Sequence, residues 1–334
     1  MEQNIFEKTN HVSKWQLENK KTVSLKIFFL KWEWLLVLIL FSVFVLNASL
    51  SAHFLNGNTM ITATRVFLDQ AFIVFPMVFV ILLGDIDISV GSTVALSSVV
   101  MGVSFRAGVP MVLAMVICLL VGTFCGFING LLITKFKELS AVIVTLGTMI
   151  TYRGIAYMIL ENQAVGGFPM WYTFLGWGAV GPVPFILIAF ITFAIIFCLL
   201  LHKTNFGRQI YAMGKNSTAS YFSGINVDRN KIIVFTLAGF MAAVTALFLT
   251  SRMGSTRPNI AANYELNVIA MVALGGVSTL GGKGKMFGPI IAVFIIGYLQ
   301  FGLGLINISS ETLMIIIGGL LVLSVSATKI KIKK

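Results

Sequence analysis

Residues 109–132 read VPMVLAMVICLLVGTFCGFINGLL and contain no charged side chain. An α-helix needs about 20 consecutive apolar residues to cross the hydrocarbon core of a bilayer. The bilayer core contains no water to which backbone N–H and C=O groups could bond. An α-helix bonds these groups to each other, whereas an irregular segment exposed to lipid leaves them without partners. The stretch therefore predicts a membrane-spanning α-helix.

Similar apolar runs recur along nearly the whole chain. Of its 334 residues, 57% are hydrophobic and 11% are charged, against about 25% charged in an ordinary soluble domain. Strong candidate segments lie near 34–50, 66–83, 109–132, 139–160, 183–201, 232–250, 287–305 and 312–327. Two weaker segments are 88–104 and 265–280. We expect an all-α polytopic membrane protein of about ten transmembrane helices, with the weak pair tilted, broken or re-entrant. Eight full spans is the alternative.

The distribution of basic residues orients these segments. With ten crossings and both termini in the cytoplasm, the inside regions hold 19 of the 24 Lys and Arg residues, and four, Arg252 among them, lie in outside loops. The positive-inside rule predicts this asymmetry. We expect a cytoplasmic N-terminal segment at 1–33, a transmembrane domain at 34–327 with a cytoplasmic loop at 202–231, and a basic cytoplasmic tail at 328–334. The net charge of +12 then reflects topology and attraction to anionic membrane lipid, and nucleic acid is not an expected partner.

The residues that carry chemistry are few and scattered. The three histidines lie far apart, the three cysteines lie within apolar runs, and the sequence contains no metal-binding or nucleophile motif. We expect no catalytic residue, no metal site and no cofactor, and therefore no enzyme. The polar first thirty residues do not resemble a cleavable signal peptide.

Three charges lie close to or inside the apolar segments. Asp85 and Asp87, in LGDIDISVG, could form a proton or cation site of a secondary transporter. Alternatively, Asp87 or Ser89 caps the helix that starts near Ile88. We favour the cap, because the turn is expected at the cytoplasmic ends of two segments, close to water. Arg153 either extends to the membrane interface or lines a polar cavity, and the sequence leaves both open.

A glycine-rich stretch, LGGVSTLGGKGK at Leu274–Lys285, raises the question of a phosphate-binding loop. A P-loop requires G-x-x-x-x-G-K followed by Ser or Thr. For Lys283 the first glycine position is Val277 and the following residue is Gly284, so the motif fails, as it does for the second lysine. We expect a membrane hinge or packing loop, in which glycines let the backbone turn and helices approach closely.

The polar loop 202–231 contains the pattern of a short capped helix. Residues 216–218, Asn-Ser-Thr, can each cap a helix start, and Gly224 suits the position after a helix end. A short helix at Ala219–Ser223 would give a soluble partner a place to dock at the membrane surface. An ordinary surface loop is the alternative.

Several motifs resemble those of permease subunits of ATP-binding-cassette (ABC) sugar importers. NFGRQIYAMGKNSTASYFSGI is similar to that family's pattern G-R-x-x-Y-A-x-G-x-N-x-x-A-A-x-x-x-G-I. LLGDIDISVGSTVAL, FINGLLI, VIVTLGTMITYRGIA and VALGGVSTLGGKGKMFGPIIAVFI extend the resemblance over residues 70–325, in the family's order. The family is that of the monosaccharide permeases for ribose, xylose and arabinose, and the lead-in KWEWLLVLIL looks most like the rhamnose and autoinducer-2 importers.

The resemblance implies a type II-like ABC importer permease in a bacterial cytoplasmic membrane, paired with an identical or different second permease around a central path. It implies that separate ATPase subunits dock on the 202–231 loop and that an extracytoplasmic sugar-binding protein delivers the cargo. The docking residues that it assigns are Gly207, Arg208, Gly214, Asn216, Ala219 and Gly224. This chain departs from the family at Lys215 and Ser220, which leave the cap and the terminating glycine in place.

A neutral sugar requires hydrogen-bonding groups along its path and no fixed ion site. The candidates are Asn129, Thr145, Thr148, Asn162 and Gln163, although Asn129 and Thr145 fit interhelical hydrogen bonds equally well. One alternative is a stand-alone ion-coupled secondary transporter, which predicts intramembrane acids facing a cavity and paired broken helices. Another is a scaffold without transport activity.

Overall fold

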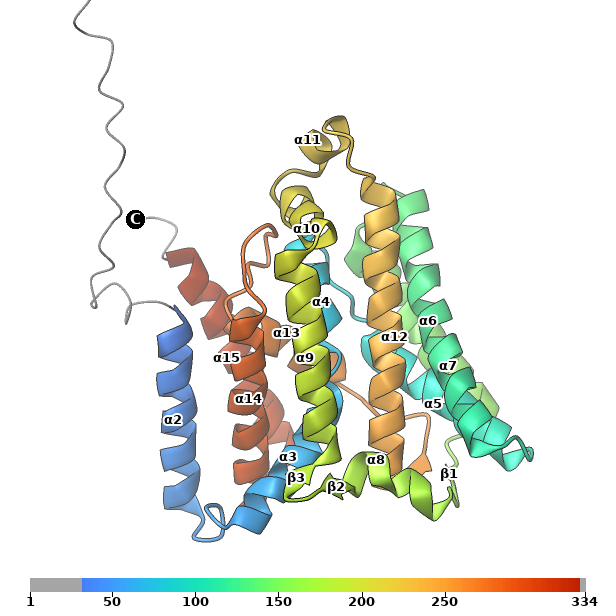
Figure 1. Ribbon diagram of the computed structural model, residues 1–334, viewed down its shortest axis with the longest axis vertical. Coiled ribbons are helices and arrows are strands. Elements are labelled where there is room, and N and C mark those ends of the chain that lie inside the picture. Colours follow the sequence, from blue (N-terminus) through green and yellow to red (C-terminus); the bar gives the residue numbers. More distant parts are fainter. Residues whose placement is uncertain (1–31, 331–334) are drawn as a thin grey trace, which may run out of the picture.

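The computed structural model describes residues 32–330, and nearly all of its regular structure is helical (Figure 1). The expected segment 1–33 lies outside the described residues apart from its last two positions, and so does most of the tail 328–334. The longer helices are α2 (Trp32–Leu50), α3 (Gly57–Ala71), α4 (Val74–Leu82), α5 (Val90–Arg106), α6 (Met111–Lys135), α7 (Ala141–Leu160), α9 (Phe185–Lys203), α10 (Asn205–Lys215), α12 (Val227–Met253), α13 (Tyr264–Leu274), α14 (Phe287–Leu305) and α15 (Ser310–Ile330). The short elements are β1 (Val165–Gly166), the 3-10 helix η1 (Met170–Thr173), α8 (Phe174–Trp177), β2 (Ala179–Val180), β3 (Val183–Pro184), α11 (Ser217–Phe222) and β4 (Ser255–Thr256).

Among the described residues, six helices are long and apolar enough to cross a membrane: α2, α6, α7, α9, α12 and α14. The pair α3 and α4, bent by 40° at a short break, brings the number to seven if it forms one span. The two segments expected to be weak are indeed shorter helices, since α5 has 17 residues and α13 has 11. The chain is a polytopic helical membrane protein, while the count of ten crossings stays a prediction.

Local signals in the sequence account for several helix ends. Pro110, whose missing N–H is harmless at a helix start, precedes α6. Ser140 accepts a hydrogen bond from the backbone N–H of Ile143 and caps α7. Gly254 adopts a left-handed conformation, with φ of +67°, where α12 ends. These turns divide the apolar sequence into separate helices.

The interface between α6 and α12 is built from small residues. A Cβ placed on Gly122 would lie 2.6 Å from the Gly239 carbonyl oxygen and from the Ala243 Cβ, and one on Gly126 would lie 2.9 Å from the Gly239 Cα. Real Cβ atoms do not approach other atoms so closely, so these positions require glycine. The hydrophobic effect does not drive helices together within a bilayer. Small residues promote their association instead, because they allow the backbones to make close van der Waals contact.

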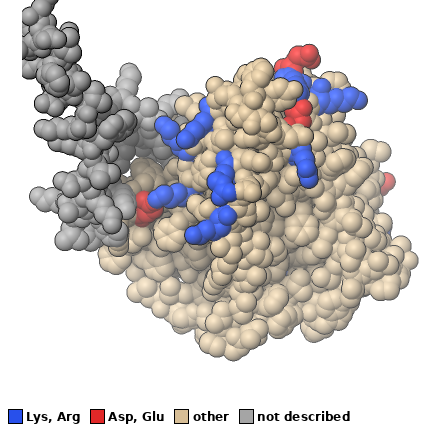
Figure 2. Space-filling model, turned by 45° about the horizontal axis from the view of Figure 1, so that its top comes forward, with Lys and Arg blue, Asp and Glu red and all other residues tan. Residues whose placement is uncertain are grey.

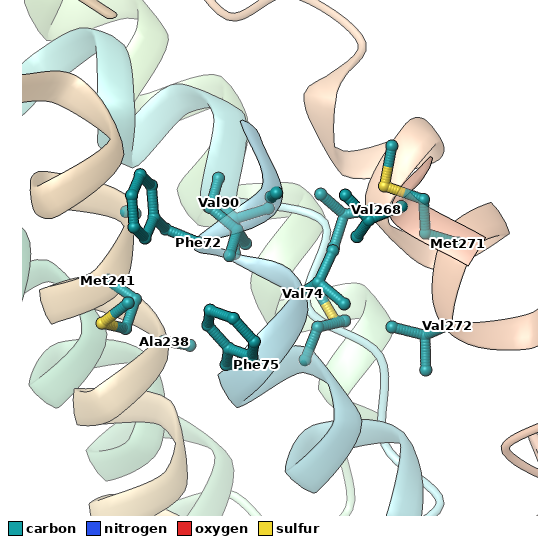
Figure 3. Close-up of a cluster of buried hydrophobic side chains, with 14 of the residues drawn as sticks. Phe72, Val74, Phe75, Val90, Ala238, Met241, Val268, Met271 and Val272 are labelled. Atoms are coloured by element: carbon teal, nitrogen blue, oxygen red, sulfur yellow. The ribbon is translucent and has the colours of Figure 1, made fainter. Parts of the chain in front are cut away.

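Helix α4 occupies the centre of the bundle, with every residue from Val74 to Leu82 buried. Figure 3 shows Phe72 and Phe75 directed toward α12, while Val74 faces α13. Phe72 stacks on Phe248 with ring centroids 4.7 Å apart. The core thus surrounds α4. The discontinuity before it is buried, whereas the one after it reaches the surface at Gly84 and returns to the core at Asp87.

The two ends of the bundle differ in structure and charge. Helices α10 and α11 project at one end, whereas α8 and the short strands lie at the opposite end (Figure 1). Figure 2 shows Lys and Arg side chains over the end that carries α10 and α11. We call this the basic end, and the end with the strands the strand end.

Candidate docking and transport sites

Helix α11 at the basic end is a short capped helix, as the loop sequence predicted. The Asn216 side-chain oxygen accepts a hydrogen bond from the Ala219 N–H at 2.9 Å. The helix spans Ser217–Phe222, and Gly224 follows with φ of +84°, a left-handed conformation that favours glycine. Among the three candidate caps, the structure therefore uses Asn216.

Two large aromatic side chains at the end of α11 face outward. Tyr221 is 66% exposed and Phe222 is 82% exposed. Exposed aromatic residues on a polar surface are typical of protein–protein contacts. Because α11 projects beyond the ends of the long helices (Figure 1), the pair forms a raised apolar contact surface.

Helix α10 joins this surface to the membrane helices through the glycine-rich loop. Gly214 packs so closely on the Leu82 carbonyl oxygen, at the end of α4, that a side chain would collide with it. The Gly282 N–H donates to the same carbonyl oxygen at 2.8 Å, and the Tyr211 hydroxyl donates to the Gly284 carbonyl oxygen at 2.7 Å. A displacement of α10 would therefore be transmitted to α4 and to this loop.

The remaining docking candidates lie along α10. Gly207 packs against the Leu201 carbonyl oxygen, where a Cβ would collide. Its N–H donates to the Thr204 hydroxyl, which caps the helix at 3.2 Å. Arg208 is exposed and donates a hydrogen bond to the Asn205 side chain. The candidates thus divide into two closely packed glycines that fix α10, Gly207 buried and Gly214 half-buried, and polar or exposed residues that face outward.

A pocket of about 590 Å³ lies between α11 and the adjacent ends of α6 and α7. Asp85 lines it and forms an ion pair with Lys231, with 2.7 Å between the carboxylate oxygen and Nζ. A second, more exposed ion pair joins Lys137 to Asp228 at 2.9 Å. Asp85 is consequently paired with a lysine at the basic end, and it does not share a site with Asp87.

Asp87 lies in a buried hydrogen-bond network at the break between α4 and α5. It is 1% exposed, so the expected contact with water is absent. One carboxylate oxygen accepts hydrogen bonds from the Ser89 N–H at 2.9 Å and the Ser89 hydroxyl at 2.7 Å. The Asn129 amide donates to that hydroxyl at 2.7 Å, and Tyr152 donates to the Asn129 oxygen at 3.1 Å. Asp87 therefore caps the turn that leads into α5, two residues before Ser89, the N-cap position, whose own side chain makes no capping bond.

The five residues expected along the path do not all come together. Asn129 and Thr145 both bind the α4–α5 break, since the Thr145 hydroxyl accepts from the Ile88 N–H at 3.3 Å. Thr148 lies one turn along α7, with its hydroxyl bonded to the Thr145 carbonyl oxygen. Asn162 and Gln163 are exposed beyond the end of α7 at the strand end. The structure thus places Asn129 and Thr145 in interhelical contacts, the alternative that the sequence left open.

Arg153 lines a second pocket, of about 520 Å³, between α7 and the segment that leads into α13. Its Nη1 donates to the carbonyl oxygens of Pro258 and Ile260, both at 2.7 Å. Of the two roles left open for this arginine, the structure places it in a polar cavity. Glu265, on α13, lines the same pocket.

A buried ion pair at the bend between α3 and α4 has no counterpart in the sequence predictions. Asp69 is 1% exposed, and one of its carboxylate oxygens accepts from Arg252 Nη2 at 2.7 Å and Nε at 3.0 Å. The Tyr264 hydroxyl donates to the other oxygen at 3.3 Å. Arg252 lies in the last turn of α12 and not in an outside loop. The single available signal was an arginine at the end of an apolar run, which does not reveal a partner 183 residues away.

Comparison with known proteins identifies the class of protein. Residues 59–325 match the family model described as branched-chain amino acid transport system / permease component. The autoinducer 2 import system permease protein LsrD of Escherichia coli K12 is 33% identical over 311 residues, covering 91% of this chain and 93% of the relative. The LsrD protein of Yersinia enterocolitica is 35% identical over 292 residues, covering 85% and 87%. No solved structure matches the chain.

Proposed function

We propose that this chain, which belongs to the family of branched-chain amino acid transport system permease components, carries a neutral sugar or sugar-derived molecule inward. It is a permease subunit of an ABC import system and not an enzyme. The named relatives import autoinducer 2, which supports a small furanose-derived cargo. Pentoses and deoxyhexoses such as rhamnose are the other candidates. The apolar helices place the protein in the membrane as a multi-pass subunit.

The observation that carries the proposal is the α10–α11 unit. It combines an exposed aromatic pair, a capped short helix and a buried connection to α4. These features suit a surface on which an ATPase subunit docks and through which its movement reaches the membrane helices. The docking residues would be Gly207, Arg208, Gly214, Asn216, Ala219 and Gly224, joined by Tyr221 and Phe222.

The charge distribution supports an orientation with the basic end in the cytoplasm (Figure 2). With ten crossings, counting the α3–α4 pair, α5, α13 and α15, both termini would also be cytoplasmic. An extracytoplasmic binding protein would then meet the strand end, near Asn162 and Gln163. A second permease, identical or paralogous, would complete a central path.

An ion-coupled secondary transporter is the less favoured function. It requires an intramembrane acid that is free to exchange a proton or cation. Three acids beside the helix breaks are already engaged, because Asp69 is paired with Arg252, Asp85 with Lys231, and Asp87 accepts two hydrogen bonds from Ser89. A fourth acid, Glu265, does line a cavity, but Arg153 lines the same cavity and opposes its charge.

Docking is tested by changing Gly224 in the complete importer. Gly224→Val should lower ATPase co-purification and uptake of labelled autoinducer 2 by about tenfold, because a β-branched residue is strained at positive φ. Gly224→Asn should retain most of both. The matched control is Gly108→Val, a glycine with φ of +92° and open space around it, which follows α5 and not α11. Normal ATPase association and uptake in Gly224→Val would overturn the docking assignment.

A further inference from the structure

The pocket between α7 and α13, which we call the α7–α13 pocket, combines opposite charges with amide and hydroxyl groups. Its polar lining consists of Ser92, Arg153, Tyr157, Asn259, Asn263 and Glu265. Its volume of about 520 Å³ falls within the 300–1,000 Å³ of typical small-molecule sites. It is separate from the docking surface, because Arg153 lies in the half of α7 nearer the strand end.

Arg153 is held in place while part of its guanidinium stays available. Both of its hydrogen bonds to described residues use Nη1, which donates to two backbone carbonyl oxygens. Nε and Nη2 thus remain for a molecule in the pocket. A guanidinium fixed at one nitrogen presents its other donors in a defined plane, which suits two neighbouring oxygen atoms of a ligand.

Glu265 supplies the complementary acceptor. One of its carboxylate oxygens is buried and has no hydrogen-bond partner among residues 32–330. Gly91 makes room for this carboxylate, because a Cβ at Gly91 would collide with that oxygen. Because that oxygen is enclosed against Gly91, a ligand hydroxyl could donate only to the part of the carboxylate that lines the pocket.

Arg153 and Glu265 carry opposite charges but do not form an ion pair with each other. Both side chains line the pocket, yet the ion pairs found within the described part of the chain join other residues. An arginine alone would favour an anion and a glutamate alone a cation. The pair together leaves the pocket without net charge, and so favours a neutral ligand rich in donors and acceptors.

We propose that the α7–α13 pocket is a binding site for a neutral polyhydroxylated molecule, with Arg153 donating to ligand oxygens and Glu265 accepting from ligand hydroxyls. The proposal rests on the proposed import function. It adds a binding site for the cargo and names the absence of net charge as the property by which the site selects it. Asn259 and Asn263 carry both donors and acceptors and complete a set suited to vicinal hydroxyl groups.

The test uses the complete importer in proteoliposomes, with autoinducer 2 as the transported probe. Glu265→Gln keeps an acceptor but removes the negative charge that compensates Arg153, and uptake should fall about tenfold, because a hydrogen bond to a carboxylate is stronger than one to an amide. Arg153→Gln alone, which weakens the donor and leaves Glu265 uncompensated, should also lower uptake. The double variant Arg153→Gln, Glu265→Gln restores neutrality, and its loss of uptake should be smaller than the product of the two single effects. An anionic sugar, ribose 5-phosphate, should compete with the probe in Glu265→Gln and not in the wild type.

Folding and assembly are followed in parallel by ATPase co-purification and by the size-exclusion profile. Thr151→Val, which removes an exposed hydroxyl bonded within α7 and outside the pocket lining, serves as the control and should leave uptake within twofold of the wild type. Uptake within twofold of wild type in Glu265→Gln, or a double variant that falls by the product of the two single effects, would overturn the site. Failure of the wild-type importer to take up the probe or to bind its ATPase would instead count against the proposed function.

Discussion

The two discontinuities beside α4 both contain a buried aspartate, but the protein neutralises the two carboxylates differently. Asp69, at the α3–α4 bend, is paired with Arg252 from α12. Asp87, at the α4–α5 break, accepts hydrogen bonds from Ser89, two residues away. The first contact joins distant parts of the chain and balances a charge, whereas the second is local. Removing a partner at the first site should therefore cost far more than a conservative change at the second.

The largest effect is expected for Asp69→Ala. It leaves the Arg252 guanidinium mostly buried without its carboxylate, and breaking a buried ion pair costs about 3–5 kcal/mol. We expect loss of folded protein or a large fall in the thermal unfolding temperature, measured on the purified chain in detergent.

The control for this effect is the double variant Asp69→Ala, Arg252→Leu, which also removes the stranded positive charge. It should recover part of the lost stability. If Asp69→Ala alone proved as stable as the wild type, the ion pair would not be what holds the bend.

A smaller loss is expected for Asn129→Leu at the second discontinuity. The change removes the amide that donates to Ser89 and accepts from Tyr152. Tyr152 retains its bond to the Cys125 carbonyl oxygen at 3.0 Å, so the cost should be about 1–3 kcal/mol. The measurement is the thermal unfolding of Asn129→Leu compared with that of Thr123→Val. This control removes a half-buried hydroxyl that is bonded within its own helix. Equal stability of the two variants would contradict an interhelical role for Asn129.

The same contrast explains what the sequence could and could not predict. The α11 cap, its terminating glycine and the short turn at Asp87 depend on neighbours within a few positions, so residue type and spacing suffice. The Asp69–Arg252 pair and the α7–α13 pocket join segments about 100 or more residues apart. Nothing in a single sequence reveals which of several isolated charges will meet once the helices pack.

Burial is the other property that local patterns missed. Asp87 is expected close to water because the turn lies at the cytoplasmic ends of two segments. The chain does reach the surface at Gly84, just after α4, but it then turns back into the bundle, so Asp87 is buried. The glycine-rich loop was easier to interpret. A Cβ on Gly276 would lie 2.6 Å from the Trp32 ring, which is the close packing that its composition indicated.

The smallest effect is expected for Asp87→Asn. The asparagine side-chain oxygen can accept the Ser89 hydrogen bonds in place of the carboxylate, and amide and acid caps are nearly equivalent. The stability loss should therefore stay below about 1 kcal/mol, comparable to that of Asp228→Asn, which disrupts an exposed ion pair worth roughly 0–1 kcal/mol. Both variants should take up autoinducer 2 at more than half of the wild-type rate in the complete importer. Loss of uptake in Asp87→Asn at an unchanged protein level, with Asp228→Asn unaffected, would mean that the carboxylate charge is required. The two aspartates beside α4 would then differ in function as well as in structure, and an ion-coupled mechanism would regain support.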